Sequence, residues 1–148
     1  MNKFIKTFSE LSPQQLYDVL RLRQNVFIIE QNCIYADIDD SDNQGIHILF
    51  YEGDSLAAYA RIFGPDIKFE NACAIGRIIV SPAFRGTGLG RQLITESIEW
   101  CKKEFVATDI QIEAQALLIN YYQQFGFIPI GNIYPVDGID HIQMVIPA

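Results

Sequence analysis

The sequence predicts a single α/β (α+β) domain over residues 1–148, with a mixed, largely antiparallel central sheet flanked by about four helices. Short apolar runs with turn residues between them follow one another through the middle of the chain, as strands joined by hairpins do. An amphipathic helical pattern over 93–105 then returns the chain to a strand-like run over 109–114, so the sheet is not purely antiparallel. At 148 residues, the chain can bury a core without disulfide or metal support.

The N-terminal part begins with a strand and a capped helix. Residues 3–8 alternate in character, as a strand packed on at least one face does. Ser12 can cap a helix, Pro13 fits its first position, and Gln15 completes a Ser-x-x-Gln capping box. Apolar side chains recur at helical spacing over 16–27, which predicts a face that packs against the sheet.

Turn signals separate the remaining elements. The runs 46–51 and 56–63 are joined by Glu52-Gly53-Asp54-Ser55, a hairpin signal, and the run 72–80 adds a third antiparallel strand. After the strand over 109–114, the pattern predicts a short helix marked by Leu118, Tyr122 and Phe125, then two antiparallel strands over 127–130 and 139–146.

Composition and charge exclude several function classes. The net charge of −7 disfavours a general nucleic-acid surface, which needs a basic stripe. The N-terminal residues lack the apolar region of a signal peptide, and no apolar run is long enough to cross a membrane, so we expect a cytoplasmic protein. Cys33, Cys73 and Cys101 lie far apart with no Cys-x-x-Cys pair, so we expect reduced thiols and no metal site.

The segment Arg85-Gly86-Thr87-Gly88-Leu89-Gly90-Arg91 is the most informative part of the chain, because it joins an apolar strand to an amphipathic helix. Its glycines let backbone N–H groups converge, and the dipole of the following helix points the same way, so a diphosphate would fit there. A P-loop would require Lys and Ser or Thr after Gly90, and a dinucleotide-binding unit would place its glycines after the first strand. Spacing alone leaves a diphosphate site and an ordinary strand-to-helix turn as alternatives.

The spacing Arg85-x-x-Gly88-x-Gly90 resembles the acyl-CoA pyrophosphate motif of the GNAT superfamily of N-acetyltransferases. Further blocks in matching order extend the resemblance over nearly the whole chain, to the ElaA-like branch of that superfamily. These blocks are Leu22-Arg23-x-x-Val26-Phe27-x-x-Glu30-Gln31, Ile75-Gly76-Arg77-x-x-Val80, Ala114-Gln115-Ala116, Tyr121-Tyr122-x-x-Phe125-Gly126-Phe127 and Asp137-Gly138-Ile139-x-His141. The resemblance implies a GNAT-like sheet and a reaction with acetyl-CoA as co-substrate and no metal.

By this resemblance, the strand over 72–80 and the glycine segment hold acetyl-CoA. Backbone groups of the strand would pair with the pantetheine arm, and the Val80 N–H would face the thioester oxygen. Gln115 takes the place of the motif asparagine and keeps the amide donor and acceptor. The implied acetyl-CoA contacts are Ile78, Ile79, Val80, Arg85, Gly86, Thr87, Gly88, Leu89, Gly90, Arg91 and Gln115.

Tyr122, four residues before Gly126, lies where the family places its general acid. The resemblance implies that its phenol protonates the departing thiolate, while the Val80 N–H stabilises the oxyanion. Spacing alone favours a different interpretation, in which Tyr121 and Tyr122 are both core aromatics on a short helix. The motif supports a catalytic role for Tyr122 only.

The general base is not assigned. Many superfamily members carry a glutamate three residues before the final valine of the strand, but this chain has Arg77 there, and a cation cannot accept a proton. Arg77 is either a salt-bridged core residue or a contact for a substrate carboxylate. Glu113, Glu30, His141 or a water chain would serve as the base, with Glu113 counted among the catalytic residues. The plain alternatives are a solvated or salt-bridged sheet residue for Glu113 and a hydrogen-bonded strand residue for His141.

The resemblance also implies an acceptor side. The expected substrate contacts are Arg23, Glu30, Gln31, Arg77 and His141. Residues 35–42 contain four aspartates, which predict either a solvated loop or the border of an acceptor pocket that attracts a cationic amine. A calcium site is disfavoured because the spacing lacks the required glycine and terminal glutamate.

The function implied by the resemblance is direct transfer of an acetyl group from acetyl-CoA to a primary amine of a small molecule or peptide. Its partners would be acetyl-CoA and the amine acceptor, with no nucleic acid and no membrane, in a monomer or homodimer. One alternative is a non-catalytic acyl-CoA-binding regulatory domain, which the missing glutamate base favours. Another alternative is an enzyme like the acyl-homoserine-lactone synthases, because the segment Leu22-Arg23-x-x-Val26-Phe27 also resembles a helix of that family.

Overall fold

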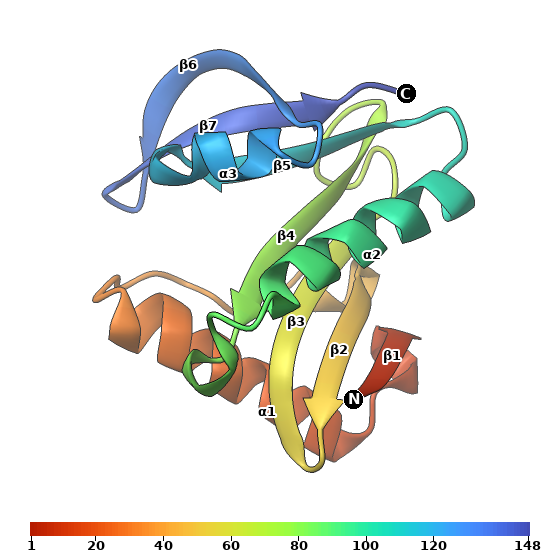
Figure 1. Cartoon of the computed structure of the whole chain (residues 1–148), viewed down its shortest axis with the longest axis vertical. Coiled ribbons are helices and arrows are strands. Elements are labelled where there is room, and N and C mark those ends of the chain that lie inside the picture. Colours follow the sequence, from red (N-terminus) through yellow and green to blue (C-terminus); the bar gives the residue numbers. More distant parts are fainter.

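The computed structural model describes residues 1–148, whose seven strands form one sheet in the order β1-β2-β3-β4-β5-β7-β6 (Figure 1). The strands are β1 (Asn2–Thr7), β2 (Ile46–Glu52), β3 (Ser55–Phe63), β4 (Ala72–Val80), β5 (Asp109–Gln115), β6 (Ile128–Val136) and β7 (Ile139–Ile146). Every neighbouring pair is antiparallel except β4 and β5, which the helical crossover makes parallel. The predicted mixed, largely antiparallel sheet is therefore confirmed.

Three α-helices accompany the sheet, where the sequence predicts about four helices. They are α1 (Pro13–Arg23), α2 (Leu89–Glu104) and α3 (Ile119–Gln123). A π-helical segment, η2 (Gln24–Glu30), continues α1, and four single 3₁₀ turns complete the set: η1 (Phe8–Glu10), η3 (Asp42–Gln44), η4 (Pro82–Phe84) and η5 (Ala116–Leu118). No helix is long and apolar enough to cross a membrane.

The start of α1 confirms the predicted capping box. The Ser12 hydroxyl accepts the Gln15 backbone N–H at 3.1 Å, and the Gln15 side chain accepts the Ser12 N–H at 2.9 Å. Both hydrogen bonds satisfy backbone donors that the first turn of a helix leaves free. The entry of the chain into α1 is thereby fixed by residues that are visible in the sequence.

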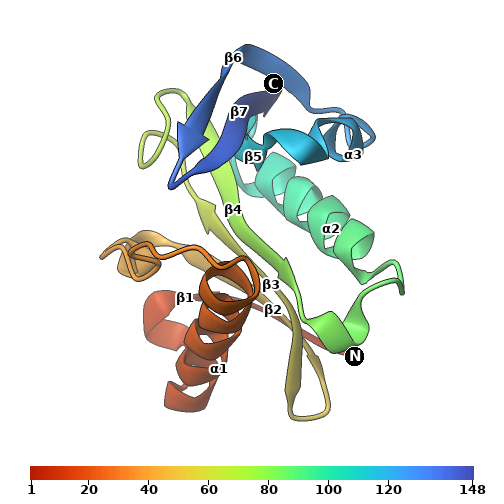
Figure 2. The ribbon, with the colours of Figure 1, turned by 90° about the vertical axis from the view of Figure 1, so that its left-hand side faces the viewer.

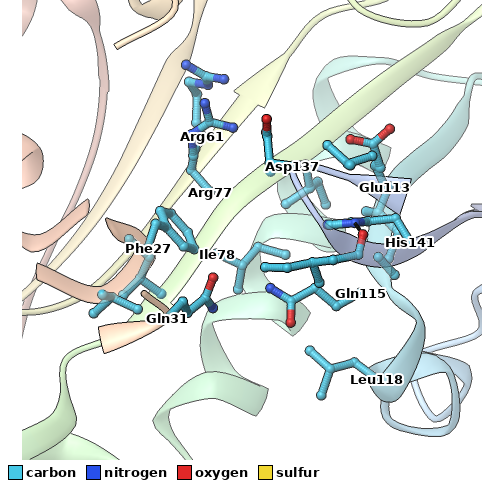
Figure 3. Close-up of a pocket in the computed structure, with 18 of the residues that line it drawn as sticks. Phe27, Gln31, Arg61, Arg77, Ile78, Glu113, Gln115, Leu118, Asp137 and His141 are labelled. Carbon is cyan, nitrogen blue, oxygen red and sulfur yellow. Dashed lines mark hydrogen bonds between the residues drawn. The ribbon is translucent and has the colours of Figure 1, made fainter. Parts of the chain in front are cut away.

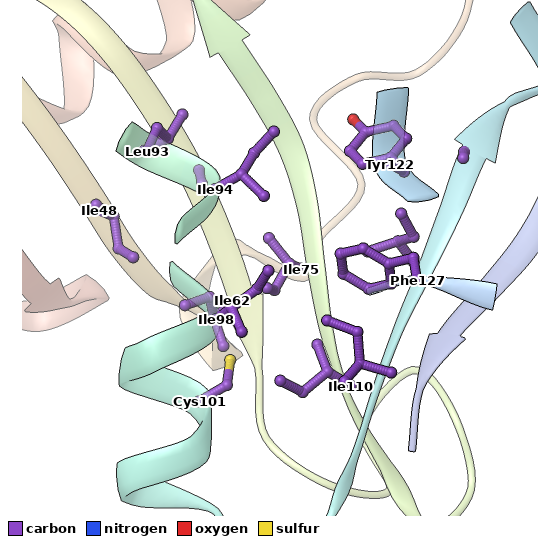
Figure 4. Close-up of a cluster of buried hydrophobic side chains, with 14 of the residues drawn as sticks. Ile48, Ile62, Ile75, Leu93, Ile94, Ile98, Cys101, Ile110, Tyr122 and Phe127 are labelled. Atoms are coloured by element: carbon purple, nitrogen blue, oxygen red, sulfur yellow. The ribbon is translucent and has the colours of Figure 1, made fainter. Parts of the chain in front are cut away.

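Helices cover both faces of the sheet (Figure 2). On one face, α1 and η2 bury Val19, Leu22 and Val26 against side chains of β2, β3 and β4. On the other face, α2 buries Leu93, Ile94 and Ile98 in a larger cluster that also receives Tyr122 and Phe127 (Figure 4). The following members of that cluster come from the sheet: Ile48, Phe50, Ala58, Ala60, Ile62, Ile75, Ile110, Ile112 and Met144. The two cores hold β4 in the middle of the molecule.

The neighbouring strands β4 and β5 pair over only a short distance. Their register runs from Ala72 opposite Asp109 to Ala74 opposite Gln111, and beyond that point the strands diverge. The rest of β4, residues 75–80, has no partner strand on the β5 side. Its backbone is therefore open to another molecule at the centre of the sheet.

A β-bulge interrupts β4 on its other side. Tyr59 of β3 lies opposite Ile79, whereas Arg61 lies opposite Gly76, so Arg77 and Ile78 together face a single residue of β3. Arg77 takes the left-handed backbone conformation at the bulge, with φ of 49°. This conformation is costly for a residue other than glycine, so neighbouring contacts must hold it.

The strand β6 is longer than the sequence predicts, because it continues to Val136 rather than ending at 130. Gly131 has φ of 71° and lies where the β6–β7 register shifts, so the strand bulges there and resumes at Tyr134. Pro135 is tolerated because β6 is an edge strand, where a missing N–H donor costs little. Glycine and proline therefore interrupt the sequence pattern without ending the strand.

Candidate active site

The diverging strands enclose a cavity of about 490 Å³, here called the β4–β5 cleft (Figure 3). Its walls come from η2, the loop after it, β3, β4, β5, α3 and β7. Most of the predicted site residues line it: Gln31, Arg77, Ile78, Ile79, Val80, Arg85, Glu113, Gln115, Tyr122 and His141. The structure therefore brings together residues that are up to 110 positions apart in the chain, from Gln31 to His141.

A second cavity of about 380 Å³, here called the glycine-loop pocket, adjoins the cleft at Val80 and Arg85, which line both. Gly86 and Gly88 have φ of 77° and 82°, a conformation that glycine adopts without strain. None of the backbone N–H groups from Gly86 to Arg91 has a hydrogen-bond acceptor within the protein. Since α2 begins at Leu89 with no side-chain cap, these donors and the helix dipole form an anion site.

The side chains flanking the glycines are already engaged. Arg85 donates from Nε to the Val80 carbonyl at 3.1 Å and forms a bidentate ion pair with Glu30, at 2.5 and 3.0 Å. Arg91 donates to Gln124 at 2.5 Å, and the Thr87 hydroxyl donates to the Phe84 carbonyl at 2.6 Å. The backbone N–H groups and the remaining guanidinium nitrogens of Arg91 are therefore the unpaired donors of this pocket.

Glu30, a candidate base and substrate contact, does not line the β4–β5 cleft. The hydrogen bond from Arg85 lowers the pKa of this carboxyl, which makes it a weaker base. The ion pair instead connects η2 to the end of β4. Glu30 is thus a link between two walls of the site.

Tyr121 and Tyr122 face different cavities. Tyr122 is 8% exposed, packs edge-on against Phe127 at 6.0 Å between ring centres, and lines the β4–β5 cleft. Its hydroxyl lies at the edge of the apolar cluster and has no hydrogen-bond partner (Figure 4). Tyr121 lines the glycine-loop pocket, where its hydroxyl would lie 3.3 Å from a Cβ placed on Gly90. Only Tyr122 therefore reaches the cleft.

Burial raises the pKa of Tyr122 to about 12. The direction follows from the cost of placing a phenolate in apolar surroundings, and the neighbouring Tyr121 adds to it. The hydroxyl consequently keeps its proton throughout the physiological pH range. It is available as a donor to a group in the cleft.

Two candidate bases line the wall formed by β5 and β7. Glu113 accepts a hydrogen bond from the Tyr134 hydroxyl through Oε2 at 2.6 Å, and its other oxygen has no partner. His141 lies with Nδ1 2.6 Å from the Ile139 carbonyl, which can only accept. Nδ1 of the neutral ring must therefore carry the proton, which leaves Nε2 as the acceptor. Figure 3 shows both side chains beside Gln115.

The aspartates of residues 35–42 are not a solvated loop, in contrast to one prediction. Arg23 donates from Nε to Asp37 at 2.9 Å and from Nη1 to Asp42 at 2.7 Å. Arg61 donates to Asp42 at 2.7 Å and to Asp39 at 3.0 Å. With Arg77 on Asp37 at 2.8 Å, three arginines neutralise three of the four carboxylates. The prediction that this segment attracts a cationic amine is therefore wrong for these three aspartates, whose charges are already paired.

The prediction that Arg23 contacts the substrate is also wrong. Its side chain has no exposed surface and does not line the β4–β5 cleft. Burial alone would raise the pKa of Asp42, but hydrogen bonds from Arg23 and Arg61 outweigh it and hold that pKa below its ordinary value. Arg23 thus ties the end of α1 to the loop that follows η2, and its role is structural.

Arg77 is salt-bridged, one of the two roles that the sequence left open. Its Nε and Nη2 donate to the carboxylate and the backbone carbonyl of Asp37, at 2.8 and 3.1 Å. Asp37 is buried and also binds Arg23, so this aspartate connects α1 to the bulge in β4. These contacts hold the left-handed backbone of Arg77 described above.

We expect Arg77→Ala to destabilise the protein more than Arg77→Gly, although both remove the same ion pair. Glycine adopts the left-handed conformation without strain, whereas alanine there costs about 1–2 kcal/mol. Thermal or urea unfolding of the two variants measures the difference. Equal stability would mean that the bulge is not held in this conformation when its anchor is lost.

Sequence patterns did not reveal several other residues of the cleft. Arg61 and Lys68 line it but belong to no motif, and Asp137 lines it although the block Asp137-Gly138-Ile139-x-His141 gave it no expected role. Arg61 interrupts the apolar run 56–63, and a charge inside such a run indicates a buried partner. Lys68 lies in a turn, where charged residues are common, so no signal distinguishes it, whereas the motif block that contains Asp137 could have indicated that residue.

No group of three or more His, Cys, Asp or Glu side chains is arranged to hold a metal ion. The three cysteines are free thiols. Cys73 and Cys101 are buried, and Cys33 lines the β4–β5 cleft with its sulfur 3.5 Å from the Asp137 carbonyl.

A family model described as an acetyltransferase (GNAT) domain matches residues 8–147. The chain belongs to the GNAT family. Within it, this GNAT chain is 49% identical over 138 residues to the protein ElaA of Escherichia coli (strain K12), a match that covers 92% of this chain and 90% of ElaA. The resemblance to the ElaA-like branch is thereby confirmed.

Solved structures agree with this assignment. The GNAT chain superposes on crystalline Escherichia coli ElaA with a TM-score of 0.91 and 43% identity, over 98% and 99% of the two chains. An acyl-CoA N-acyltransferase from Pseudomonas aeruginosa gives a TM-score of 0.92 and 34% identity, over 97% of each chain. The acyl-homoserine lactone synthase BjaI, at 17% identity and a TM-score of 0.76, shares the fold alone, over 96% of this chain and 82% of BjaI. This GNAT chain is an acyl-CoA-dependent acyltransferase.

Proposed function

We propose that this enzyme transfers an acetyl group from acetyl-CoA directly to a primary amine of a small molecule or peptide. The observation that carries the proposal is the junction of the two cavities at Val80. On one side lie unpaired N–H groups suited to a diphosphate, and on the other lies the unpartnered hydroxyl of Tyr122. We place the enzyme in the cytoplasm as a monomer or homodimer.

The residues of the two cavities would bind different parts of acetyl-CoA. The N–H groups from Gly86 to Arg91 would bind the diphosphate, and the open edge of β4, from Ile78 to Val80, would pair with the pantetheine arm. Gln115, which lines the cleft, adds an amide to the same wall. The thioester would then lie beside Tyr122, with its carbonyl oxygen facing the Val80 N–H.

The chemical step needs one proton removed and one supplied. Glu113 or Nε2 of His141 would accept the proton of the amine as its nitrogen attacks the thioester carbon. The Val80 N–H would stabilise the oxyanion, and the C–S bond would break as the oxyanion collapses. Tyr122 would give its proton to the departing sulfur, and solvent would restore that proton.

Gly88→Asp tests the diphosphate site. A Cβ at Gly88 meets nothing within 4 Å, so the new side chain would extend into the open pocket without a clash, and the cost to the fold is the strain of a non-glycine residue at a φ of 82°. A carboxylate among the unpaired N–H groups would occupy them and repel the diphosphate. We expect the Kd for acetyl-CoA, measured by calorimetry, to rise at least tenfold, about 1.4 kcal/mol.

Gly88→Asn is the matched control, since asparagine has the same shape, tolerates a positive φ equally well and carries no charge. It should retain more affinity than the aspartate variant. Unchanged binding of acetyl-CoA by a folded Gly88→Asp protein would remove the glycine-loop pocket from the proposal. Thiol release with a panel of amines, with products identified by mass, then separates an acetyltransferase from a non-catalytic acyl-CoA-binding domain and from a lactone synthase.

A further inference from the structure

One cationic side chain of the β4–β5 cleft has no partner in the protein. Lys68, in the turn between β3 and β4, lines the cleft and forms neither a hydrogen bond nor an ion pair. Its Nζ lies 5.3 Å from the centre of the Phe69 ring. Arg61 and Arg77, which also line the cleft (Figure 3), are by contrast ion-paired with Asp37, Asp39 and Asp42, although the buried Nε of Arg61 lacks a hydrogen-bond acceptor.

The surroundings of Lys68 favour an incoming anion. Lys68 is exposed at the edge of the cleft, where desolvation by the surrounding walls still lowers its pKa; Glu113 and Asp39 raise that pKa, and Arg77 and Arg61 lower it. No carboxylate lies within 4 Å of its ammonium. An anionic group placed beside Lys68 would supply the hydrogen-bond acceptor and the counter-charge that this ammonium lacks.

The wall formed by β5, β7 and the turn before β7 has the complementary character. Glu113 keeps one free carboxylate oxygen, the Asp137 carboxylate has no partner, and Nε2 of His141 can accept a proton. Figure 3 shows Glu113 and Asp137 on the side of the cleft away from Phe27. The charges of the three arginines and the three aspartates that pair with them cancel, so the free charges of the cleft are one ammonium and two carboxylates; the paired residues are Arg23, Arg61, Arg77, Asp37, Asp39 and Asp42.

We propose that the acceptor is an amine that also carries a carboxylate, as an amino acid does, and that Lys68 binds this carboxylate. The amine of such an acceptor would face Glu113 and His141, where the proton is removed. The inference rests on the acetyltransferase function proposed above, whose acceptor it specifies. It also reverses the expectation from the sequence, because the aspartates that would attract a purely cationic amine are bound to arginines.

The experiment compares the common free amino acids with their α-amides as acceptors in the thiol-release assay with acetyl-CoA. The carboxylate raises the basicity of the neighbouring amine, so chemical reactivity alone would favour the amides. We expect kcat/KM for the preferred amino acid to exceed that for its amide by about tenfold to a hundredfold, the range for a hydrogen bond between charged groups. A preference for the amide, or for a diamine, would overturn the inference.

Three variants then test the role of Lys68. Lys68→Met keeps the length of the side chain and removes its charge. It should therefore raise KM for the amino acid, leave kcat/KM for its amide unchanged, and so abolish the preference for the amino acid. Lys68→Arg should restore most of the preference. Lys103→Met, at the exposed end of α2, is the matched control and should behave as wild type. If the Lys68→Met enzyme kept the wild-type preference for the amino acid, Lys68 would not be the residue that binds its carboxylate.

Binding distinguishes a failure of this inference from a failure of the proposed function. If no amine causes thiol release, the acetyltransferase proposal fails, and the amino acids are tested as ligands of the enzyme saturated with CoA. A rise in Tm with an amino acid but not with its amide, lost in Lys68→Met, would support the carboxylate site independently of turnover. The absence of any such rise would overturn it.

Discussion

Replacing Tyr122 with phenylalanine is expected to lower the rate of acetyl transfer by about 10²–10⁴-fold, the usual contribution of a positioned general acid. The substitution removes only the hydroxyl, and that hydroxyl has no partner within the protein whose hydrogen bond would be lost. The ring would keep its edge-on contact with Phe127 in the larger core. Folding stability and the affinity for acetyl-CoA should therefore barely change.

Tyr121→Phe is the internal control for this prediction. Its hydroxyl points to the glycine-loop pocket, so the variant should turn over at close to the wild-type rate. Because the pKa of Tyr122 is about 12, the hydroxyl stays protonated, and the wild-type rate should show no loss from its ionisation below about pH 11. A wild-type rate for Tyr122→Phe, or a larger loss for Tyr121→Phe, would assign the proton to another group.

The sequence predicts those features of the site whose parts lie close together in the chain. The glycines after β4 and the free N–H groups of α2 are adjacent residues, so their spacing already implies an anion site. The division between Tyr121 and Tyr122 follows from the angle of about 100° between neighbouring helical side chains. The capping box of α1 is local in the same way.

Features that depend on distant pairing do not follow from local patterns. The position of the β-bulge in β4 depends on its register with β3, and the divergence of β4 from β5 depends on where their pairing ends. Likewise, Arg61 meets Asp42 across 19 residues and Arg77 meets Asp37 across 40. From the sequence alone, a run of aspartates is predicted to be a solvated loop, because the arginines that pair with it lie far away in the chain.

This network of arginines and aspartates makes Asp42 the residue with the largest expected effect on stability. Its Oδ1 accepts hydrogen bonds from both Arg23 and Arg61, each at 2.7 Å, and those two side chains are 0% and 3% exposed. Asp42→Asn would leave two enclosed guanidinium groups with one fewer counter-charge and an amide that cannot serve both as well. Breaking a buried ion pair costs about 3–5 kcal/mol, so we expect a loss of that size in the free energy of unfolding.

The pH dependence of unfolding provides the second measurement. The pKa of Asp42 is held below its ordinary value and that of Asp39 falls to about 2, in each case because arginine hydrogen bonds outweigh the opposing effect of burial. Their contribution to stability is therefore complete above the unfolded-state pKa of about 3.9 and is lost as the pH falls through the lower folded-state values. Between about pH 5 and pH 2, wild type should lose stability more steeply than Asp42→Asn, which lacks one of these carboxyls.

Asp40→Asn removes an exposed aspartate from the same segment and should match wild type in both measurements. If Asp42→Asn matched wild type as well, the network would contribute nothing to the fold, and the loop that borders the cleft would have to be held by other contacts.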